Sequence, residues 1–592
     1  MTYTNGNYAA FCKPRKPNGI EDKKAYIVGG GLAGLSAAAF LIRDGQMPGK
    51  NITIFEELSL AGGGCDGIKD SKLGYVIRGG REMEDHFECL WDLYRSIPSL
   101  KNEGQSVLDE FYYLNEDDPS SSPLRVTEKQ GMNAHTLHKF KLTDKAALEL
   151  VNLFLTPEKD LEDKTITDVF SSEFFESNFW LFWRTMFAFE DWHSAIEMRR
   201  YLTRYIHHAH NITDISCLKF TTYNQYESLI LPLLTFLQNN GVNFVYNTIV
   251  TSVLFKSEND KKYIDRILFK KTNENGKEES ILVNDKDLVF VTLGSNTEQS
   301  ALGDQNHKAE VSKDIGATWK LWENIVAQDQ SFGCPKKFYG DTTRSNWESA
   351  TVTCIDDKIP NYVKKLLGRD PYNGKIVTGG PITAKDSSWL MSWTISRQPH
   401  FKVQKPNEIV AWVYGLFSNT VGDYVHKTME ECTGEEICKE WLYHIGVPVE
   451  EIDDLAANHA VTIPCMMPYV TSYFMPRKIN DRPKIVPENS MNFAFIGEHV
   501  ETPNDTVFTT EYAVRTGMEA VYTLLDLDRG VPEVFASQYD MRMLMRVSTH
   551  MLDGRKITDM KLPFIQKFAL KKGLKMLKGT TLYEMMENYK LI

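Results

Sequence analysis

A glycine motif near the start of the chain constrains the fold more than any other feature of the sequence. Gly29, Gly31 and Gly34 follow an apolar run at 25–28 and precede an uncharged run at 35–42. This order predicts a strand, a tight turn and a buried helix, because the second glycine admits a pyrophosphate and the third packs helix on strand. The next apolar run, 51–55, ends at Glu56, a hydrogen-bond acceptor suited to ribose hydroxyls. We therefore predict a dinucleotide-binding unit here, and the glycines argue against a membrane span.

Two further buried-strand patterns lie far along the chain, at 287–294 and 493–497, and each ends at a glycine. They predict an α/β fold whose doubly wound, Rossmann-type sheet is assembled from distant segments. The aromatic-rich stretch 174–205 lacks alternation and predicts helices of a lid or substrate region. Residues 256–286 predict a hairpin with its turn at 273–277.

Composition excludes several classes of protein. A chain of 592 residues, 42% hydrophobic and 25% charged, fits neither a disulfide-stapled scaffold, a disordered chain nor a multi-span membrane protein. A net charge of -12 argues against nucleic-acid binding. Nine scattered cysteines without a Cys-x-x-Cys pair predict neither disulfides nor a metal site. Since residues 1–19 contain no apolar signal segment, we expect a cytoplasmic location.

The residues after Glu56 favour a flavin over a nicotinamide. The segment 56–63 resembles the acid and double-glycine extension of FAD-dependent oxidoreductases, as do the strand before Gly294 and the segment 497–517. Residues 224–253 look like the amine-oxidase and phytoene-desaturase branch. The resemblance implies an FAD-binding Rossmann-type domain, with cofactor contacts from Gly29, Gly31, Ala33, Gly34, Glu56, Gly63, Gly64, Arg81, Met83, Val250, Ser295, Gly497, Glu498 and Thr509.

The motif at 78–84 follows a short strand pattern at 74–77. Gly79 and Gly80, between Arg78 and Arg81, allow backbone to approach a flat anionic cofactor. A surface ion-pair run is the alternative interpretation. The neighbouring flavin motif favours the cofactor-binding interpretation. Under that interpretation Glu82 lies where the flavin ring and the substrate would meet.

The segments 79–100, 11–19, 397–401 and 464–469 together resemble the bacterial fatty acid double-bond hydratases, the oleate hydratases or myosin-cross-reactive antigens. The likeness runs from about Tyr3 to the carboxyl end. It implies a hydro-lyase that adds water across a cis double bond of free oleate- or linoleate-class fatty acids, giving 10- or 13-hydroxy acids. FAD is bound without being consumed, and a homodimer is expected. A flavin-dependent oxidoreductase of the amine oxidase or desaturase type is the alternative, and a non-catalytic lipid carrier is a third reading.

Hydrating an isolated alkene requires a proton donor and a water-orienting base on opposite sides of the double bond. The resemblance implies that Glu82 orients and activates the water and that Tyr201 protonates the alkene. A tyrosine with its ordinary pKa of about 10 is a weak acid, so we expect help from Arg81 or Arg200. Without the resemblance, Tyr201 would be read as a packed core tyrosine.

A free fatty acid also needs its carboxylate held, because each methylene of sliding costs only about 0.8 kcal/mol. The resemblance implies carboxylate binding by Gln225, Thr394, Ser396 and His400, with Arg81 also at the substrate. Position 396 is often asparagine in oleate-type members, and Gly64-Cys65 departs from the usual Gly-Gly-Ser-Leu-Asp-Gly. We hypothesise that Ser396 moves hydration towards the thirteenth carbon.

The end of the chain is basic, with eleven Lys and Arg against four Asp and Glu after residue 540. Lysines at 567, 571, 575 and 578 share one side of a predicted helix, and apolar residues fill much of the rest. This pattern is typical of a helix in a membrane interface, so we expect peripheral contact with the inner face of the membrane. Packing of the apolar face on the protein or on a dimer mate stays open as an alternative.

From these features we predict six segments. Residues 1–150, 221–300 and 486–535 form the FAD-binding domain, 151–220 a helical substrate or lid region, 301–485 the substrate-binding domain, and 536–592 the basic amphipathic C-terminal helices.

Overall fold

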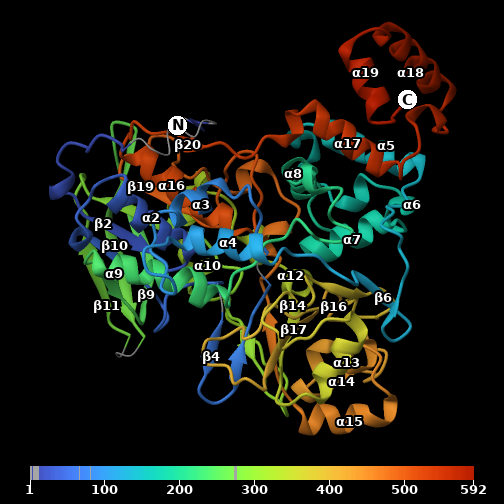
Figure 1. Ribbon diagram of the computed structural model, residues 1–592. Coiled ribbons are helices and arrows are strands. Elements are labelled where there is room, and N and C mark those ends of the chain that lie inside the picture. Colours follow the sequence, from blue (N-terminus) through green and yellow to red (C-terminus); the bar gives the residue numbers. More distant parts are fainter. Residues whose placement is uncertain (1–2, 5–12, 66, 81, 273–275) are drawn as a thin grey trace.

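The computed structural model describes residues 3–4, 13–65, 67–80, 82–272 and 276–592. Its centre is a parallel sheet of five strands in the order β19-β12-β2-β3-β8. These strands are β2 (Ala25–Val28), β3 (Ile52–Phe55), β8 (Asn243–Val245), β12 (Leu288–Thr292) and β19 (Phe493–Ile496). The α/β fold and the assembly of the sheet from distant segments are therefore confirmed (Figure 1).

Helices and a second sheet flank these strands. The helix α2 (Leu32–Arg43) packs against α16 (Thr510–Leu524), and α3 (Glu88–Tyr94) packs on α16. The predicted hairpin is present as β10 (Lys261–Lys271) and β11 (Glu278–Leu282), which pair antiparallel, and β9 (Thr248–Glu258) completes a three-stranded sheet. Part of the predicted turn, 273–275, lies outside the described residues. The helix α10 (Ala317–Gln328) lies on β9, and α9 (Leu231–Asn239) follows a π-helical turn at Tyr226–Ile230.

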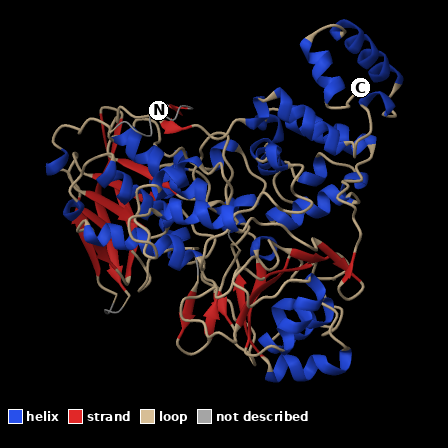
Figure 2. Ribbon diagram, viewed as in Figure 1, coloured by secondary structure: helices blue, strands red, loops and turns tan. Residues whose placement is uncertain are grey.

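The second large unit is an eight-stranded sheet in the order β13-β18-β14-β17-β16-β15-β6-β7 (Figure 2). Six strands come from the segment 301–485: β13 (Ala301–Leu302), β14 (Trp347–Cys354), β15 (Ile382–Ala384), β16 (Met391–Thr394), β17 (Ile409–Gly415) and β18 (Ala460–Met467). The short strands β6 (Val126–Glu128) and β7 (Met132–Asn133) also join this sheet, although they fall within the segment 1–150. The helices of this unit are α11 (Lys336–Tyr339), α12 (Thr342–Ser345), α13 (Lys358–Leu367), α14 (Gly434–His444) and α15 (Val449–Asn458).

The aromatic-rich stretch is helical, as predicted. It contains the end of α6 (Ser172–Phe175), α7 (Asn178–Phe187) and α8 (Ala195–Arg204), with a 3-10 turn at Ile206–His208 after α8, and α5 (Asp144–Leu155) precedes it. Trp180 and Trp183 of α7 are fully buried, so burial of large rings holds this region on the body of the protein. Smaller elements are α4 (Val107–Asp117), the pair β4 (Ile68–Asp70) and β5 (Gly74–Val76), and the pair β1 (Tyr3–Thr4) and β20 (Val531–Pro532).

The C-terminal residues form α17 (Met541–Met551), α18 (Phe564–Leu577) and α19 (Thr581–Asn588), and α18 and α19 stand away from the body in Figure 1. Four apolar side chains of α18 are largely exposed, those of Phe564, Ile565, Phe568 and Met576. Its lysines at 567, 571 and 575 are exposed as well, and the helix ends one residue before Lys578. Among the described residues, no helix is both long enough and apolar enough to cross a bilayer. The eight cysteines in the described part of the chain are free, as predicted.

Candidate functional site

The glycine turn between β2 and α2 is built as the sequence predicts. Gly29 has a φ of +99°, and a Cβ there would lie 2.8 Å from Oγ1 of Thr292. A Cβ on Gly34 would lie 2.1 Å from the carbonyl oxygen of Gly29, so this glycine lets the helix pack on the strand. Gly31 and Gly63 face each other, and a Cβ on Gly63 would be 3.0 Å from the Cα of Gly31. The turn is therefore sterically restricted to glycine.

These residues open onto a cleft of about 460 Å³, which we call the cofactor cleft. Eleven of the fourteen predicted cofactor residues line it: Gly29, Gly31, Ala33, Glu56, Gly63, Gly64, Val250, Ser295, Gly497, Glu498 and Thr509. Gly34 does not line it, since it lies behind the turn, and Arg81 lies outside the described residues. Met83 is also absent from its lining and faces a different pocket, so its predicted cofactor contact is not seen.

The cofactor cleft has the polar groups that a dinucleotide needs. The N-terminal residues of α2 and α16 line it, and backbone N–H groups at helix N-termini favour phosphate oxygens. The hydroxyls of Thr292 and Thr510 are buried at the cleft and have no hydrogen-bond partner among the described residues. These are free donors for a bound group.

Carboxylates also line the cofactor cleft, beside the glycine turn. Glu56 accepts hydrogen bonds from the backbone N–H of Gly30 at 2.8 Å and of Leu58 at 2.9 Å. Burial, together with the charges of Glu298 and Glu56, raises the pKa of Glu57 to about 7. Such a cluster of acceptors suits the hydroxyls of a ribose better than it suits a phosphate.

Four residues predicted to hold a carboxylate meet in one cavity of about 50 Å³, which we call the polar pocket. Gln225, Thr394, Ser396 and His400 line it together with Glu82. Gln225 precedes the π-helical turn and Thr394 ends β16, so segments 170 residues apart supply the lining. Burial lowers the pKa of His400 to about 4, so its ring is neutral near pH 7.

A second cavity, of about 70 Å³, contains the other predicted catalytic residue, and we call it the aromatic pocket. Tyr201 and Tyr205 line it with apolar side chains, and Glu82 lines it as well as the polar pocket. Thr509 and its two neighbours line both the aromatic pocket and the cofactor cleft. The structure thus brings Glu82 and Tyr201 into one cavity, next to the cofactor cleft.

The environment of Tyr201 differs from the prediction in one respect. Burial raises the pKa of Tyr201 well above its ordinary value, and neighbouring Tyr205, Tyr473 and Glu498 raise it further. Its hydroxyl donates a 2.6 Å hydrogen bond to the carbonyl of Val507. The prediction that Arg200 assists Tyr201 in donating its proton is therefore wrong, because other groups hold Arg200.

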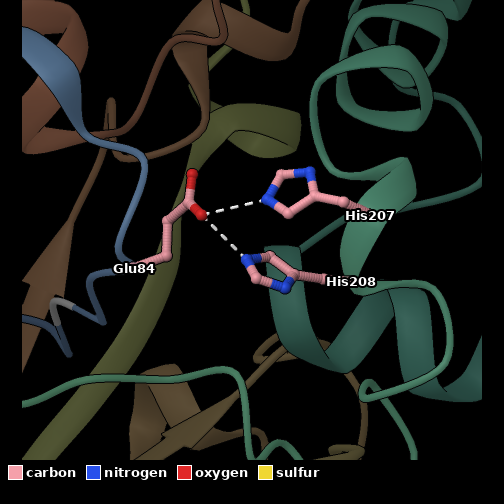
Figure 3. Close-up of side chains that lie close together, drawn as sticks. All are labelled: Glu84, His207 and His208. Carbon is pink, nitrogen blue, oxygen red and sulfur yellow. Dashed lines mark hydrogen bonds and ion pairs between the residues drawn. The ribbon is translucent and has the colours of Figure 1, made fainter. Parts of the chain in front are cut away.

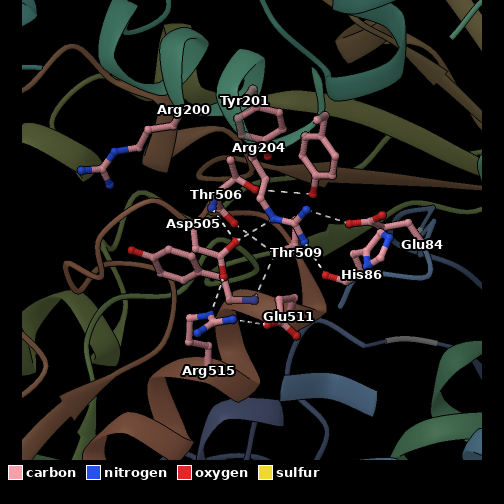
Figure 4. A network of polar contacts seen from close by, with 12 residues as sticks. Glu84, His86, Arg200, Tyr201, Arg204, Asp505, Thr506, Thr509, Glu511 and Arg515 are labelled. Carbon is pink, nitrogen blue, oxygen red and sulfur yellow. Dashed lines mark hydrogen bonds and ion pairs between the residues drawn. The ribbon is translucent and has the colours of Figure 1, made fainter. Parts of the chain in front are cut away.

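The guanidinium of Arg200 contacts Glu158 at 2.7 Å and also pairs with Glu501. Figure 4 shows it pointing away from the ring of Tyr201. The physical reason is that adjacent residues of a helix point about 100° apart, so Arg200 and Tyr201 do not share a face of α8. The other expected helper, Arg81, lies outside the described residues.

Sequence reasoning missed a buried polar network beside this pocket. It joins Glu84, Arg204, Asp505 and Arg515 (Figure 4), and two histidines, His207 and His208, bind the same Glu84. The two adjacent histidines directly after a predicted helix were the available signal. Their partner Glu84 lies more than 120 residues earlier, which no local pattern shows.

The fold and the cleft define an α/β protein with a dinucleotide-type site beside a buried pocket of acid and tyrosine side chains. The MCRA family model matches residues 22–522, and the chain belongs to this family, which confirms the family predicted from the motifs. An oleate hydratase of Streptococcus pyogenes is 50% identical over 595 residues, covering 100% of both chains. A linoleate hydratase of Lactiplantibacillus plantarum is 30% identical over 573 residues, covering 90% of this chain and 98% of its own. Among solved structures, cyclohexylamine oxidase from Brevibacterium oxydans aligns with a TM-score of 0.49 at 11% identity, covering 85% of this chain and 99% of its own.

Proposed function

We propose that this protein is an FAD-containing hydro-lyase that adds water across a cis double bond of free unsaturated fatty acids of the oleate and linoleate class. Full-length identity of 50% to an oleate hydratase supports the reaction class. The observation that carries the proposal is the position of Glu82, which lines both the polar pocket and the aromatic pocket that contains Tyr201. An acid–base pair at such a junction suits a chain that is held at one end and reacts at its middle.

The polar pocket is the proposed site of the fatty acid carboxylate. Gln225, Thr394 and Ser396 offer neutral donors, and His400 is a neutral ring that can take up a proton beside an anion. From there the chain would pass Glu82 into the aromatic pocket. Because ligand pockets usually measure about 300 to 1,000 Å³, pockets of 50 and 70 Å³ must widen when a fatty acid binds.

The reaction moves two protons. Glu82 orients a water and takes one of its protons as the water oxygen bonds to one alkene carbon, and the phenol of Tyr201 gives its proton to the other carbon. This leaves a proton on Glu82 and a phenolate on Tyr201, which is costly among the buried acidic groups around it, so the proton on Glu82 must pass through water to the phenolate oxygen of Tyr201 to close the cycle. The substrate gains the elements of water and no electrons are exchanged.

The proposed cofactor is FAD, held in the cofactor cleft. The helix N-termini of α2 and α16 would bind its pyrophosphate, Glu56 its ribose, and the hydroxyls of Thr292 and Thr510 its remaining polar atoms. When bound, FAD would supply a flat, polar aromatic ring system. Thr509 and Thr510 line both the cofactor cleft and the aromatic pocket, so they would contact the cofactor on one side and the substrate on the other.

One experiment tests the reaction. Purified, FAD-loaded protein is incubated separately with oleate and linoleate in heavy-oxygen water, and the products are weighed by mass spectrometry. Gain of one labelled water without peroxide is the expected result. Loss of hydrogen with bleaching of the flavin would overturn it and favour an oxidoreductase of the amine oxidase or desaturase type.

We also propose that α18 rests on an anionic membrane surface at the inner face of the membrane. Its exposed Phe564, Ile565 and Phe568 would enter the lipid, and each lysine near the surface contributes about 1 kcal/mol. Flotation with anionic vesicles should fall when residues 561–592 are deleted, and unchanged flotation would contradict this role.

A homodimer in the cytoplasm is proposed from the family resemblance, and light scattering of the purified protein tests it.

A further inference from the structure

A buried carboxylate ties the segment that carries Glu82 to the helix that carries Tyr201. Glu84 is 3% exposed and follows Glu82 by two residues. Its Oε2 lies 3.0 Å from Nε2 of His207 and 2.8 Å from Nε2 of His208 (Figure 3). Its Oε1 lies 2.8 Å from the guanidinium of Arg204. The last residue of α8 and the two histidines just after it therefore converge on one side chain of the Glu82 segment.

The charge state of this cluster follows from its partners. Burial alone would raise the pKa of Glu84, but Arg204 and the two histidines hold it well below its usual range. Burial lowers the pKa of His207 to about 4, so this ring is neutral. An ionised carboxylate only accepts, so the histidines donate from Nε2, and Nδ1 of His207 then accepts from the hydroxyl of Ser537, 3.1 Å away. Oε2 of Glu84 therefore accepts from both rings, while Oε1 is held by the charge of Arg204 at 2.8 Å.

Arg204 extends the connection to a third segment. It is the last residue of α8, one helical turn after Tyr201, and its Nη2 donates to the carbonyl of His86 at 2.7 Å. Its Nε lies 3.4 Å from Asp505, which Arg515 holds at 3.0 Å. The same loop supplies the Val507 carbonyl that accepts the hydroxyl of Tyr201. Arg204 therefore contacts both the segment that carries Glu82 and the loop whose carbonyl accepts the hydroxyl of Tyr201.

We propose that Glu84, with Arg204 and His207, is a positioning unit that sets the location of Glu82 relative to Tyr201. The inference rests on the proposed function, in which these two groups act on opposite carbons of one double bond. A misplacement of about 1 Å between reacting groups costs on the order of 100-fold in rate. A rigid, fully desolvated ion pair is suited to holding two segments at a fixed separation, since losing either partner leaves a buried charge.

A metal ion is the competing explanation of the same cluster. The ligand atoms of Glu84, His207 and His208 lie within 4.8 Å of one another, which is compatible with metal binding. The guanidinium of Arg204 on the same carboxylate opposes a second cation there, and hydrogen bonds from the two rings already satisfy Oε2. The positioning role accounts for all four side chains.

The test compares three variants in the FAD-loaded, full-length protein. Glu84→Gln removes the charge at constant shape, and His207→Ala removes one donor without altering the lining of either pocket. Glu88→Gln is the matched control, because Glu88 also binds a histidine, His86 at 3.1 Å, but near the surface. Steady-state hydration of oleate is measured, together with amide hydrogen exchange of residues 78–86 and 200–208.

We expect Glu84→Gln to lower kcat about 10- to 100-fold with KM within about twofold, because the polar pocket is untouched. His207→Ala should lower kcat less, and Glu88→Gln should not change it. Exchange should accelerate in both segments. Unchanged kcat, a rise in KM alone, or unchanged exchange would overturn the inference.

Two further outcomes keep the inference separate from its alternatives. A stoichiometric divalent metal in the purified protein that is lost in Glu84→Gln would overturn the positioning role in favour of a metal site. If the wild-type protein makes no hydroxy fatty acid, the proposed function fails. Hydrogen exchange then decides the inference alone: faster exchange in both segments supports it, and unchanged exchange overturns it.

Discussion

The hydroxyl of Tyr201 donates its hydrogen to the backbone carbonyl of Val507 at 2.6 Å. Val507 belongs to the loop between β19 and α16, next to residues that line both the cofactor cleft and the aromatic pocket. The proton that the proposed mechanism takes from Tyr201 is therefore hydrogen-bonded to this loop. Under that mechanism the phenol must exchange this acceptor for an alkene carbon, so we propose that the position of the loop controls access to the proton.

Tyr201→Phe should lower kcat about 100- to 10,000-fold, the usual contribution of one proton-transfer group. Fatty acid binding should remain, because Tyr201 does not line the polar pocket. Turnover of oleate and a fluorescent fatty acid displacement assay are the measurements. Turnover within threefold of wild type would contradict the role of Tyr201, and Tyr205→Phe, which alters a second phenol of the same pocket, is the control for packing.

Glu82→Ala should abolish turnover and spare fatty acid binding, because its carboxylate is the proposed acceptor of the water proton. Glu82→Gln separates the two parts of this role, since the amide can still orient water but cannot take its proton. Both variants should retain FAD absorbance, because Glu82 does not line the cofactor cleft. A Glu82→Gln protein with wild-type turnover would remove the mechanism.

Ser396 should set which carbon is hydrated. It lines the polar pocket, and its side chain is shorter than asparagine, so the carboxylate can seat differently and shift the chain by a methylene or more. We expect linoleate to give 13-hydroxy acid with the wild type and more 10-hydroxy acid with Ser396→Asn. Fragment masses of the products locate the hydroxyl. A wild type that forms only 10-hydroxy acid would refute the hypothesis.

Fatty acid binding should take up protons through His400. The pKa of His400 is about 4 in the buried pocket, and an adjacent carboxylate raises it in the complex. The complex then binds more protons than the free protein, so affinity rises as pH falls from 8 to 6, by at most about tenfold per pH unit.

Calorimetry in two buffers of different ionisation enthalpy measures this uptake. His400→Gln should bind without it, and equal proton uptake in the two proteins would assign the effect to another group.

Glu197 should contribute stability that disappears in acid. It is fully buried, and its Oε1 contacts Arg477 at 2.8 Å and Arg482 at 3.1 Å. Although burial opposes ionisation, these arginines lower the pKa of Glu197 to about 2, from an ordinary value of 4.5. Because the folded-state pKa is depressed, the contribution is complete above pH 4.5 and declines as pH falls towards 2.

Glu197→Gln should therefore cost about 3 to 5 kcal/mol near neutral pH, since it leaves buried arginines without their anion. Thermal melts of both proteins across pH measure the difference, which should shrink below pH 4.5. Glu488→Gln, which breaks an exposed pair with Lys484, should leave the melting temperature unchanged. A difference that grew in acid would show that the sign is wrong.

The parts of the site that could be predicted are those whose cause is local. Gly29 has a φ of +99°, and Gly34 packs on the carbonyl oxygen of Gly29 five residues earlier, so the turn and its helix could be predicted from the sequence. Gln225, Thr394 and His400 come from distant segments, and their meeting in one pocket was expected only through resemblance to a family.

The contacts that could not be predicted from the sequence are ion pairs between residues far apart in the chain. Arg200 was expected beside Tyr201, but Glu158 and Glu501 draw its guanidinium away, and these partners are 42 and 301 residues distant. Met83, which the resemblance assigned to the cofactor, lines the aromatic pocket and not the cofactor cleft. The Glu84 cluster depends on contacts of the same kind, which no periodicity encodes.

The order of strands in the parallel sheet has a consequence for synthesis of the chain. The strand β19 closes one edge and ends at Ile496, while its neighbours β12, β2 and β3 come much earlier. At about 5 to 20 residues per second, a ribosome needs roughly 25 to 100 s to reach this strand. The helix α2 also waits for α16, which covers it from residue 510 onwards. The earlier strands therefore leave the ribosome with an open sheet edge, and α2 leaves it before its covering helix, so both surfaces are open to non-native pairing until residues 493–524 have been made.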